Sequence, residues 1–404
     1  MDHILRCHPV NGVNFVRGQN CALFDDQGRR FTDLESGSWA AVLGHGHPRV
    51  NRVIKDQADR IMHLGVRTPN ELAELAARDV LDLAGLPDGR CTFLSSGSEA
   101  VEFGVQAARR VTGRPFDSAP AFAEATAGRQ GRPLLLTFAD SYLAAFGSAG
   151  RKDPSEWHLL DWHAPGADDV TACLASLPFD RIGGFVFEPG GGAPGFVRFP
   201  PAPLVGAIAR RVQADGGVVV ANEITTGMGR TGKWFGYQHY DLRPDIVALG
   251  KGLGNGFPVS ATAIRREVAD ELLRRGFHHA QSHQNNPLGC AVAREVIAIL
   301  REERLIERGR DLGASFLARL RDLQARNPKI KDVRGRGMLL AVEFAPDSGL
   351  SGSAVQAALW DHGFIAAGYP AGYPAGTGLR FDPALTIDEA DLDRLLGALA
   401  DVLT

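Results

Sequence analysis

The sequence lacks paired cysteines, an excess of basic residues and any long apolar run, and each absence excludes a class of protein. Its five cysteines are scattered over 404 residues without a C-x-x-C pair, which excludes a disulfide framework and argues against a zinc site. The 44 basic and 47 acidic residues balance to −3, so we expect no nucleic-acid partner. No apolar run approaches the roughly 20 residues that cross a bilayer, and the N-terminus lacks the features of a signal peptide. We therefore expect a cytoplasmic protein that binds neither nucleic acid nor membrane.

What the chain does contain is an alternation of short apolar runs with helical patterns. The apolar runs are typical of strands buried on both faces of a parallel sheet, which predicts an α/β fold. The predicted strands are 134–138, 183–187, 217–221 and 245–249, and the predicted helices are 99–111, 203–214 and 288–303. A second region begins near residue 305, with helices expected at 306–326, 351–362 and 387–403 and a strand at 337–344. Two segments predict loops, the Ala-, Pro- and Gly-rich residues 114–132 and the repeat GYPAGYPAG within residues 368–378.

Lys251 follows the apolar run 245–249 and lies between two glycines in G-K-G-L-G-N-G. Glycines let the backbone turn sharply and pass close to a ligand. A lysine at the end of a buried strand is partly desolvated, which lowers the pKa of its amine and makes it nucleophilic toward a carbonyl. Considered alone, a lysine in a loop is more often exposed to solvent and has no catalytic role. A phosphate loop of the G-x-x-x-x-G-K-[ST] type is not an alternative, because Gly252 follows the lysine.

Two further polar segments follow predicted strands, where ligands bind in open α/β sheets. Ser95–Ala100 (SSGSEA) opens a predicted helix, and amides at a helix N-terminus together with serine hydroxyls can hold a phosphate. Ser98 followed by a glutamate is also an ordinary capping arrangement. Asn222–Gly232 (NEITTGMGRTG) ends an apolar strand, and Asn222 must be hydrogen-bonded if it is buried, with or without a ligand.

The histidines do not predict a metal site. His45 and His47 fit a turn before a helix that begins near Pro48, and no third ligand at metal spacing is evident. His278, His279 and His283 fit a structural or solvent-exposed role better than metal binding.

The three polar segments, in this order, resemble the class III aminotransferase family of fold type I pyridoxal-phosphate enzymes, which includes ornithine and acetylornithine aminotransferases and glutamate-semialdehyde aminomutase. The most specific part is N-E-I-T-T-G-M-G-R-T-G (222–232) followed by P-D-I-V-A-L-G-K (244–251). Shorter matches are G-H-G-H-P (44–48), S-G-S-E-A (96–100), E-P (188–189), N-P-L (286–288), V-R-G-R-G (333–337) and L-R-F-D-P (379–383). The resemblance implies a large pyridoxal-phosphate domain with a mostly parallel sheet at 46–304 and a smaller α+β domain at 305–404. It also implies an N-terminal segment at 1–45 that contributes to the small domain and the active site.

The resemblance also implies a role for individual residues. Lys251 carries pyridoxal 5′-phosphate as a Schiff base and shuttles a proton. Gly97 and Ser98 hold the phosphate, Tyr142 and Ile224 pack on opposite faces of the cofactor ring, and Thr225 contacts the ring hydroxyl. Ser282 takes the place of a threonine that reaches the phosphate of the neighbouring subunit, which implies a homodimer with shared active sites.

Three further residues are assigned to the substrate. Arg380 resembles an arginine that binds a substrate carboxylate, and Glu188 resembles a glutamate that can pair with that arginine. Trp39 lies in the N-terminal segment that lines the substrate pocket. The resemblance assigns no metal ligand.

The sequence departs from the family at Asn222, where the family has an aspartate, and at Leu143-Ala144, where it often has His-Gly. The third departure is the segment 114–132. A neutral amide cannot hold a proton on the ring nitrogen electrostatically, so we expect a weaker electron sink at this site.

Three hypotheses therefore stay open. The first is an aminotransferase that moves an amino group between an amino acid or primary amine and a keto acid. The second is an epimerase, aminomutase or elimination or replacement enzyme, favoured by Asn222. The third is a silent homologue, against which Lys251 argues.

Overall fold

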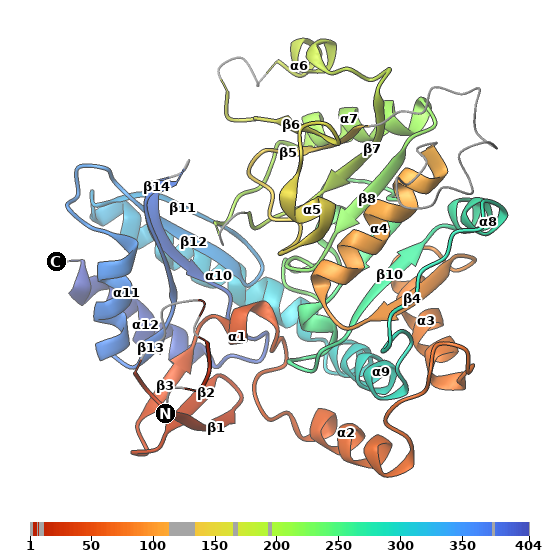
Figure 1. Cartoon of the computed structure of the whole chain (residues 1–404). Coiled ribbons are helices and arrows are strands. Elements are labelled where there is room, and N and C mark those ends of the chain that lie inside the picture. The colour runs from red at the N-terminus through yellow and green to blue at the C-terminus, as the bar shows by residue number, and fades with distance from the viewer. Residues whose placement is uncertain are drawn as a thin grey trace.

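The computed structural model describes residues 3–5, 7, 12–112, 134–164, 169–192, 196–373 and 376–403. Its centre is a seven-stranded sheet in the order β4-β10-β9-β8-β7-β5-β6 (Figure 1). The strands are β4 (Arg90–Leu94), β5 (Leu134–Phe138), β6 (Trp157–Leu160), β7 (Ile182–Phe187), β8 (Val218–Asn222), β9 (Ile246–Leu249) and β10 (Ser260–Ile264). The pairs from β9 to β6 are parallel, whereas β10 runs antiparallel to both of its neighbours. The predicted α/β fold with a mostly parallel sheet is confirmed.

Helices cover both faces of this sheet, which is why its strands β5, β7, β8, β9 and β10 are buried at every position. In β7, Val186 packs in the same cluster as residues of α4 (Gly97–Thr112). Phe185 and Phe187 point to the other face and pack with residues of α7 (Ala202–Ala214). Successive strand residues face opposite sides, so a strand between two helical layers cannot expose either set of side chains.

The predicted helices of the large region are confirmed to within a few residues. α2 begins at Pro48, as expected for a turn that contains His45 and His47. α9 begins at Pro287 and is capped by the side chain of Asn286, which accepts from two amides of the first turn. The remaining elements of this region are α2 (Pro48–Arg60), α3 (Glu71–Leu83), α5 (Gly147–Arg151), α6 (Val170–Ser176), η2 (Gly236–His239), η3 (Lys251–Leu253), α8 (Arg266–Arg274) and α9 (Pro287–Glu302).

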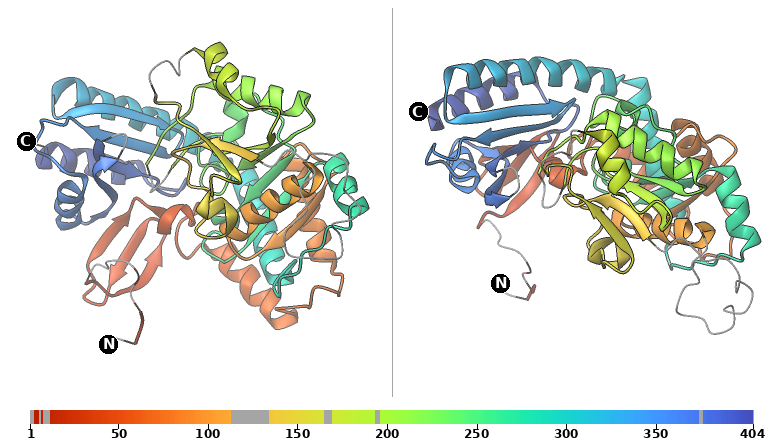
Figure 2. Two further views of the ribbon diagram at one scale, coloured as in Figure 1. Left: turned by 45° about the horizontal axis from the view of Figure 1, so that its top comes forward. Right: turned by 90° about the horizontal axis from the view of Figure 1, so that it is seen from above.

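Two smaller four-stranded sheets lie beside the large one (Figures 1 and 2). One consists of β11 (Ile330–Arg336), β12 (Leu339–Phe344), β15 (Gly376–Phe381) and β14 (Ala367–Tyr373), with helices α10 (Leu305–Arg326), α11 (Gly352–Asp361) and α12 (Glu389–Val402). The other consists of β1 (Phe15–Gln19), β2 (Ala22–Asp25), β3 (Arg30–Asp33) and β13 (Phe364–Ile365). Because β13 pairs in parallel with β3, the N-terminal segment is joined to the C-terminal region. The domain boundaries near residues 45 and 305 stay a prediction.

The expectation of a loop at 368–378 was wrong, because β14 and β15 form an antiparallel pair over much of this segment. A proline has no backbone N–H to donate, so it cannot complete the hydrogen bonds of an inner strand, which has a neighbour on each side. It is tolerated in β14 because β14 is the edge strand of its sheet. The glycines serve close packing, since a Cβ on Gly368 would lie 2.4 Å from the carbonyl oxygen of Gly352.

The other predicted loop, 114–132, lies outside the described residues. Within the part of the chain that the structure describes, every helix is too short or too polar to cross a lipid bilayer.

Candidate active site

Lys251 lies directly after β9, in the first turn of η3, with a φ of 43°. A positive φ is unfavourable for a residue with a side chain, and such strain gathers at functional sites. The Nζ of Lys251 donates a hydrogen bond to Thr225 Oγ1 at 3.3 Å and lies 4.2 Å from the centre of the Trp39 ring. Burial lowers the pKa of the Lys251 ammonium to about 8, although the Glu188 carboxylate opposes this shift. A larger fraction of this amine than of an ordinary lysine is therefore neutral and nucleophilic near neutral pH.

The ends of three strands converge beside this lysine. A Cβ placed on Gly97, at the start of α4, would lie 2.7 Å from the side chain of Ile224, which follows β8. A Cβ on Gly250, which follows β9, would lie 3.2 Å from the same side chain and 3.3 Å from Gly97 Cα. Only glycines permit so close an approach of the helix terminus, Ile224 and the lysine-bearing turn.

The N-terminus of α4 is capped by hydrogen bonds between its first turn and the residues just before it. Ser96 Oγ accepts from the amide of Glu99 at 3.3 Å, and the Glu99 carboxylate accepts from the amides of Ser95 and Ser96 at 3.1 and 2.6 Å. This reciprocal arrangement is a capping box. Ser98 Oγ accepts from the amide of Ala145 at 2.9 Å. The capping role that we weighed for Ser98 is therefore filled by Ser96.

Asn222 is buried at the end of β8, and its amide is hydrogen-bonded on both sides, as we expected. Its Nδ2 donates to the carbonyls of Tyr142 and Leu143 at 3.3 and 3.4 Å, and its Oδ1 accepts from the amide of Ile224 at 3.2 Å. Tyr142 follows β5, and its side chain is 44 % exposed, unlike most large apolar side chains near the sheet. Its ring is thus available for contact with a ligand.

Arg380 on β15 faces the same region from the small sheet. Its guanidinium carbon lies 3.6 Å from the centre of the Trp39 ring, so Arg380 and Lys251 both lie close to this ring. Arg380 Nε pairs with Asp382 Oδ1 at 2.6 Å, and Nη2 lies 3.8 Å from Glu35 Oε1. Burial raises the pKa of Glu35 to about 7 against the opposing charge of Arg380.

In this structure Glu188 pairs with Arg198 rather than with Arg380, and its expected pairing with Arg380 stays a prediction. The Glu188 carboxylate is buried, accepts from the amide of Tyr142 at 2.9 Å and lies 3.3 Å from Nη2 of Arg198. Two acidic side chains, Glu35 and Asp382, lie near Arg380 and reach it from the N-terminal segment and from the end of its own strand.

Ser282 is exposed in the turn before α9, next to Gln281. The side-chain amide of Gln281 donates to Ser95 Oγ at 3.1 Å and to Glu99 Oε1 at 3.2 Å. The turn that carries Ser282 therefore adjoins the capped start of α4 in the same chain.

Sequence reasoning missed four residues at this site: Glu35, Asp140, Arg198 and Asp382. For Asp382 a signal existed, because residues two apart on a strand share a face and R-F-D places an acid beside Arg380. Arg198 gave no signal, since it lies in the irregular segment after β7.

Comparison with known proteins identifies the family. The family model for class III aminotransferases matches residues 6–403. The chain belongs to the class III aminotransferases. It is 32% identical over 391 residues to acetylornithine aminotransferase from Methanopyrus kandleri, which covers 97% of this chain and 94% of the relative. It is 32% identical over 326 residues to ornithine aminotransferase from Halalkalibacterium halodurans, covering 79% of this chain and 78% of the relative.

Solved structures of aminotransferases have the same fold as this chain. An ornithine aminotransferase from Toxoplasma gondii superimposes with a TM-score of 0.83 at 26% identity, covering 99% of this chain and 92% of that one. A Bacillus anthracis aminotransferase with 23% identity reaches a TM-score of 0.86, covering 100% and 95% of the two chains. The fold is therefore that of the pyridoxal-phosphate-dependent aminotransferases.

This class III aminotransferase depends on pyridoxal phosphate, and its residues fit that group. A desolvated lysine suits the aldehyde, a capped helix terminus that begins with Gly97 suits the phosphate, and an accessible tyrosine ring suits the pyridine ring. Its relatives are named for transamination, so an epimerase or elimination activity is not favoured.

Proposed function

We propose that this aminotransferase transfers the amino group of an amino acid that carries a free carboxylate, with Lys251 as the residue that bears the cofactor. The observation that carries the proposal is the burial of the Lys251 amine beside Thr225 and Trp39, which lowers its pKa to about 8. When bound, pyridoxal phosphate withdraws electrons from the carbon that carries the amino group. The Lys251 amine, held at Thr225 Oγ1, would accept the proton from that carbon and deliver it to the aldehyde-derived carbon of the cofactor, which is the proton transfer that transamination requires.

The remaining residues bind and orient. Gly97 and Ser98 hold the phosphate at the α4 terminus, Tyr142 and Ile224 contact the two ring faces, and Thr225 reaches the ring hydroxyl. Asn222 supplies a neutral amide near the ring nitrogen. Because an amide is uncharged, it adds no charge at that edge, and its Nδ2 already donates to the carbonyls of Tyr142 and Leu143.

Arg380 binds the substrate carboxylate, and the Trp39 ring, which lies close to both Arg380 and Lys251, excludes water from around them. The relatives named for acetylornithine, succinylornithine and 4-aminobutyrate support a donor that carries such a carboxylate. Glu35 lies beside Arg380 and balances its charge while no carboxylate is present.

We also propose a homodimer with shared active sites, in which Ser282 reaches the partner's phosphate. Five large apolar side chains are more than two-fifths exposed and are available to an interface: Ile61, Met62, Val66, Tyr142 and Phe146. All five cysteines are free thiols, which supports a reducing compartment such as the cytoplasm.

The assignment of Lys251 is tested by chemical trapping. The protein is loaded with pyridoxal phosphate, reduced with borohydride and digested, and the modified peptide is identified by mass. We expect the modification on Lys251, its loss in Lys251→Arg and its retention in Lys152→Arg, which changes a second lysine near the site. Modification of another lysine in the wild-type protein would contradict the assignment.

A panel of amino acids and amines with a keto-acid acceptor then defines the donor. We expect activity with donors that carry a carboxylate and a marked loss of that preference in Arg380→Gln, measured as a rise in KM. An unchanged KM for carboxylate donors would remove Arg380 from substrate binding.

A further inference from the structure

Arg198 is a buried arginine that none of the roles above uses, and it connects the ends of two strands. Its side chain is 2% exposed. Nη1 donates to the carbonyl of Glu188 at 2.7 Å, and Nη2 donates to Ser141 Oγ at 2.9 Å. Nε lies 3.1 Å from Asp140 Oδ2 in an ion pair. One rigid guanidinium thus joins the segment after β5 to the segment after β7.

The charges around this guanidinium are nearly balanced. Asp140 and Glu188 are the two acids that contact it. Lys152 supplies a second cation, and its Nζ donates to the carbonyl of Ser141. Buried charges persist only when they are paired and hydrogen-bonded, so loss of the arginine would leave two carboxylates short of a partner.

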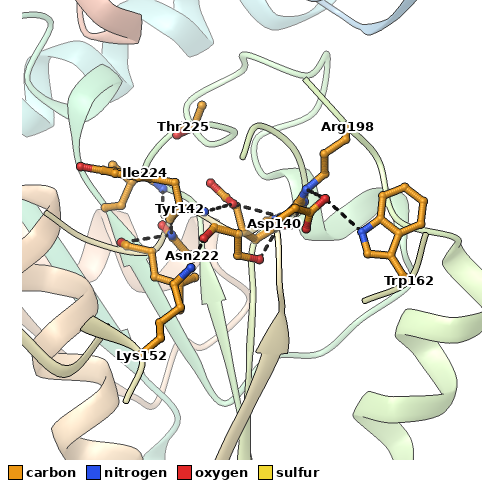
Figure 3. Close-up of polar contacts among 12 residues, drawn as sticks. Asp140, Tyr142, Lys152, Trp162, Arg198, Asn222, Ile224 and Thr225 are labelled. Atoms are coloured by element: carbon orange, nitrogen blue, oxygen red, sulfur yellow. Dashed lines mark hydrogen bonds and ion pairs between the residues drawn. The ribbon is translucent and has the colours of Figure 1, made fainter. Parts of the chain in front are cut away.

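The contacts continue from Arg198 toward the cofactor residues (Figure 3). The Glu188 carboxylate, 3.3 Å from Arg198 Nη2, accepts from the amide of Tyr142 at 2.9 Å. The carbonyls of Tyr142 and Leu143 in turn accept from Asn222 Nδ2. A continuous path therefore runs from Arg198 through the backbone of residues 140–143 to the side chain of Asn222.

This path gives a physical reason for the residue at position 222. The backbone after β5 turns two carbonyl oxygens toward that side chain, at 3.3 and 3.4 Å. A carboxylate there would face both oxygens with no proton to donate, whereas an amide donates to them. The side chain of Asn222, the first departure from the family, thus contacts the backbone of Leu143 in the second.

We propose that Arg198 is a positioning residue that fixes the Asp140–Leu143 segment and, through it, both the Tyr142 ring and the orientation of the Asn222 amide. The inference rests on the proposed contact of Tyr142 and Asn222 with pyridoxal phosphate. It goes beyond the proposed function because it assigns the geometry of the cofactor ring to a residue that does not touch it.

Arg198→Lys tests the proposal in the holoenzyme. Lysine keeps the charge but cannot reach Glu188, Ser141 and Asp140 together as the planar guanidinium does. We expect about tenfold weaker binding of pyridoxal phosphate, the scale set by one lost charge-assisted hydrogen bond. We also expect a changed visible circular dichroism of the bound cofactor and a shifted pH midpoint of its visible absorption.

Ser141→Ala serves as a milder second variant, which removes one contact of Arg198 and keeps its charge. The matched control is Arg211→Lys on α7, where the arginine side chain is 56% exposed and pairs with Asp215. The control should match the wild type in all three readouts. A double-mutant cycle with Asn222→Ala should show non-additive losses of cofactor affinity, because both changes act on the same path.

The failures are distinguishable. If the wild-type protein binds no pyridoxal phosphate, the proposed function falls and this inference falls with it. If the wild type binds the cofactor and Arg198→Lys lowers only the melting temperature, with affinity, dichroism and pH midpoint unchanged, Arg198 is merely structural and only this inference is overturned. Additive losses in the cycle would likewise overturn the path to Asn222.

Discussion

At the scale of the residue, the surroundings of Lys251 disfavour the charged form of its amine. Its pKa falls from 10.5 to about 8, a shift that corresponds to roughly 3 kcal/mol of unfavourable burial of the charged form. Below pH 8 the lysine is charged in both the folded and the unfolded state, so the folded state bears this whole cost. Between about pH 8 and 10.5 the folded state releases its proton first, and stability rises with pH.

We therefore expect the cofactor-free Lys251→Met variant to be more stable than the cofactor-free wild type near pH 7, by up to about 3 kcal/mol. The advantage should shrink as the pH approaches the value at which free lysine loses its proton. Urea unfolding of both proteins at several pH values measures it. Lys233→Met, which changes an exposed lysine, should give no such trend. A variant less stable than the wild type at neutral pH would show that the contacts of the amine outweigh its desolvation.

At the scale of the element, the short turn α1 (Ser36–Trp39) has the least usual backbone. Its four residues have φ values of 48°, 55°, 63° and 69°, so the chain makes a left-handed turn in which only Gly37 is free of strain. Left-handed residues with a side chain cost about 1 kcal/mol each. The turn places the Trp39 ring close to both Lys251 and Arg380, which is a functional reason to keep the strain.

Ser38 is exposed within this turn, so its backbone can be tested without disturbing a buried contact. Ser38→Gly should raise the free energy of unfolding by about 1 kcal/mol, because glycine adopts a positive φ without penalty. Ser38→Val should lower it, because a β-branched side chain is the least tolerant of this conformation. Chemical unfolding measures both. Equal stabilities of the two variants would show that the turn is not strained at this position.

The elements that could be predicted from the sequence are those whose signal is local. The strands β5, β7, β8 and β9 were predictable because burial on both faces leaves an unbroken apolar run. The strand β14 was not, because its glycines and proline are tolerated only at a sheet edge, and edge position is a property of the sheet rather than of the segment.

The same distinction holds for the site. Lys251 and Asn222 could be found because each follows an apolar strand. The partner of Glu188 could not be found, because Arg198 lies in an irregular segment with no local pattern. The proximity of Glu35 to Arg380 could not be found either, because these residues lie near opposite ends of the chain. Contacts of that kind depend on tertiary packing, which no local pattern encodes.

At the scale of the whole molecule, the open question is whether one chain completes its own site. Ser282 is proposed to serve the partner's phosphate, yet its neighbour Gln281 donates to Ser95 and Glu99 of the same chain. A turn at an interface between two copies could hold Gln281 against its own chain and Ser282 toward the partner. Light scattering should give the mass of a dimer. An enzyme that is active as a monomer would contradict the proposal of shared active sites.

Mixing two inactive variants decides which chain uses Ser282. Lys251→Ala lacks the amine, and Ser282→Asp places a negative charge where the phosphate is proposed to lie, so each homodimer should be nearly inactive. If Ser282 serves the partner, the mixed dimer contains one site with an intact lysine and an intact serine from the other chain. Refolding the two together should then restore activity to about a quarter of the wild-type value, because half of the random dimers are mixed and each has one of two sites intact. If Ser282 serves its own chain, every site in the mixture carries one of the two defects, and the mixture stays as inactive as the separate variants.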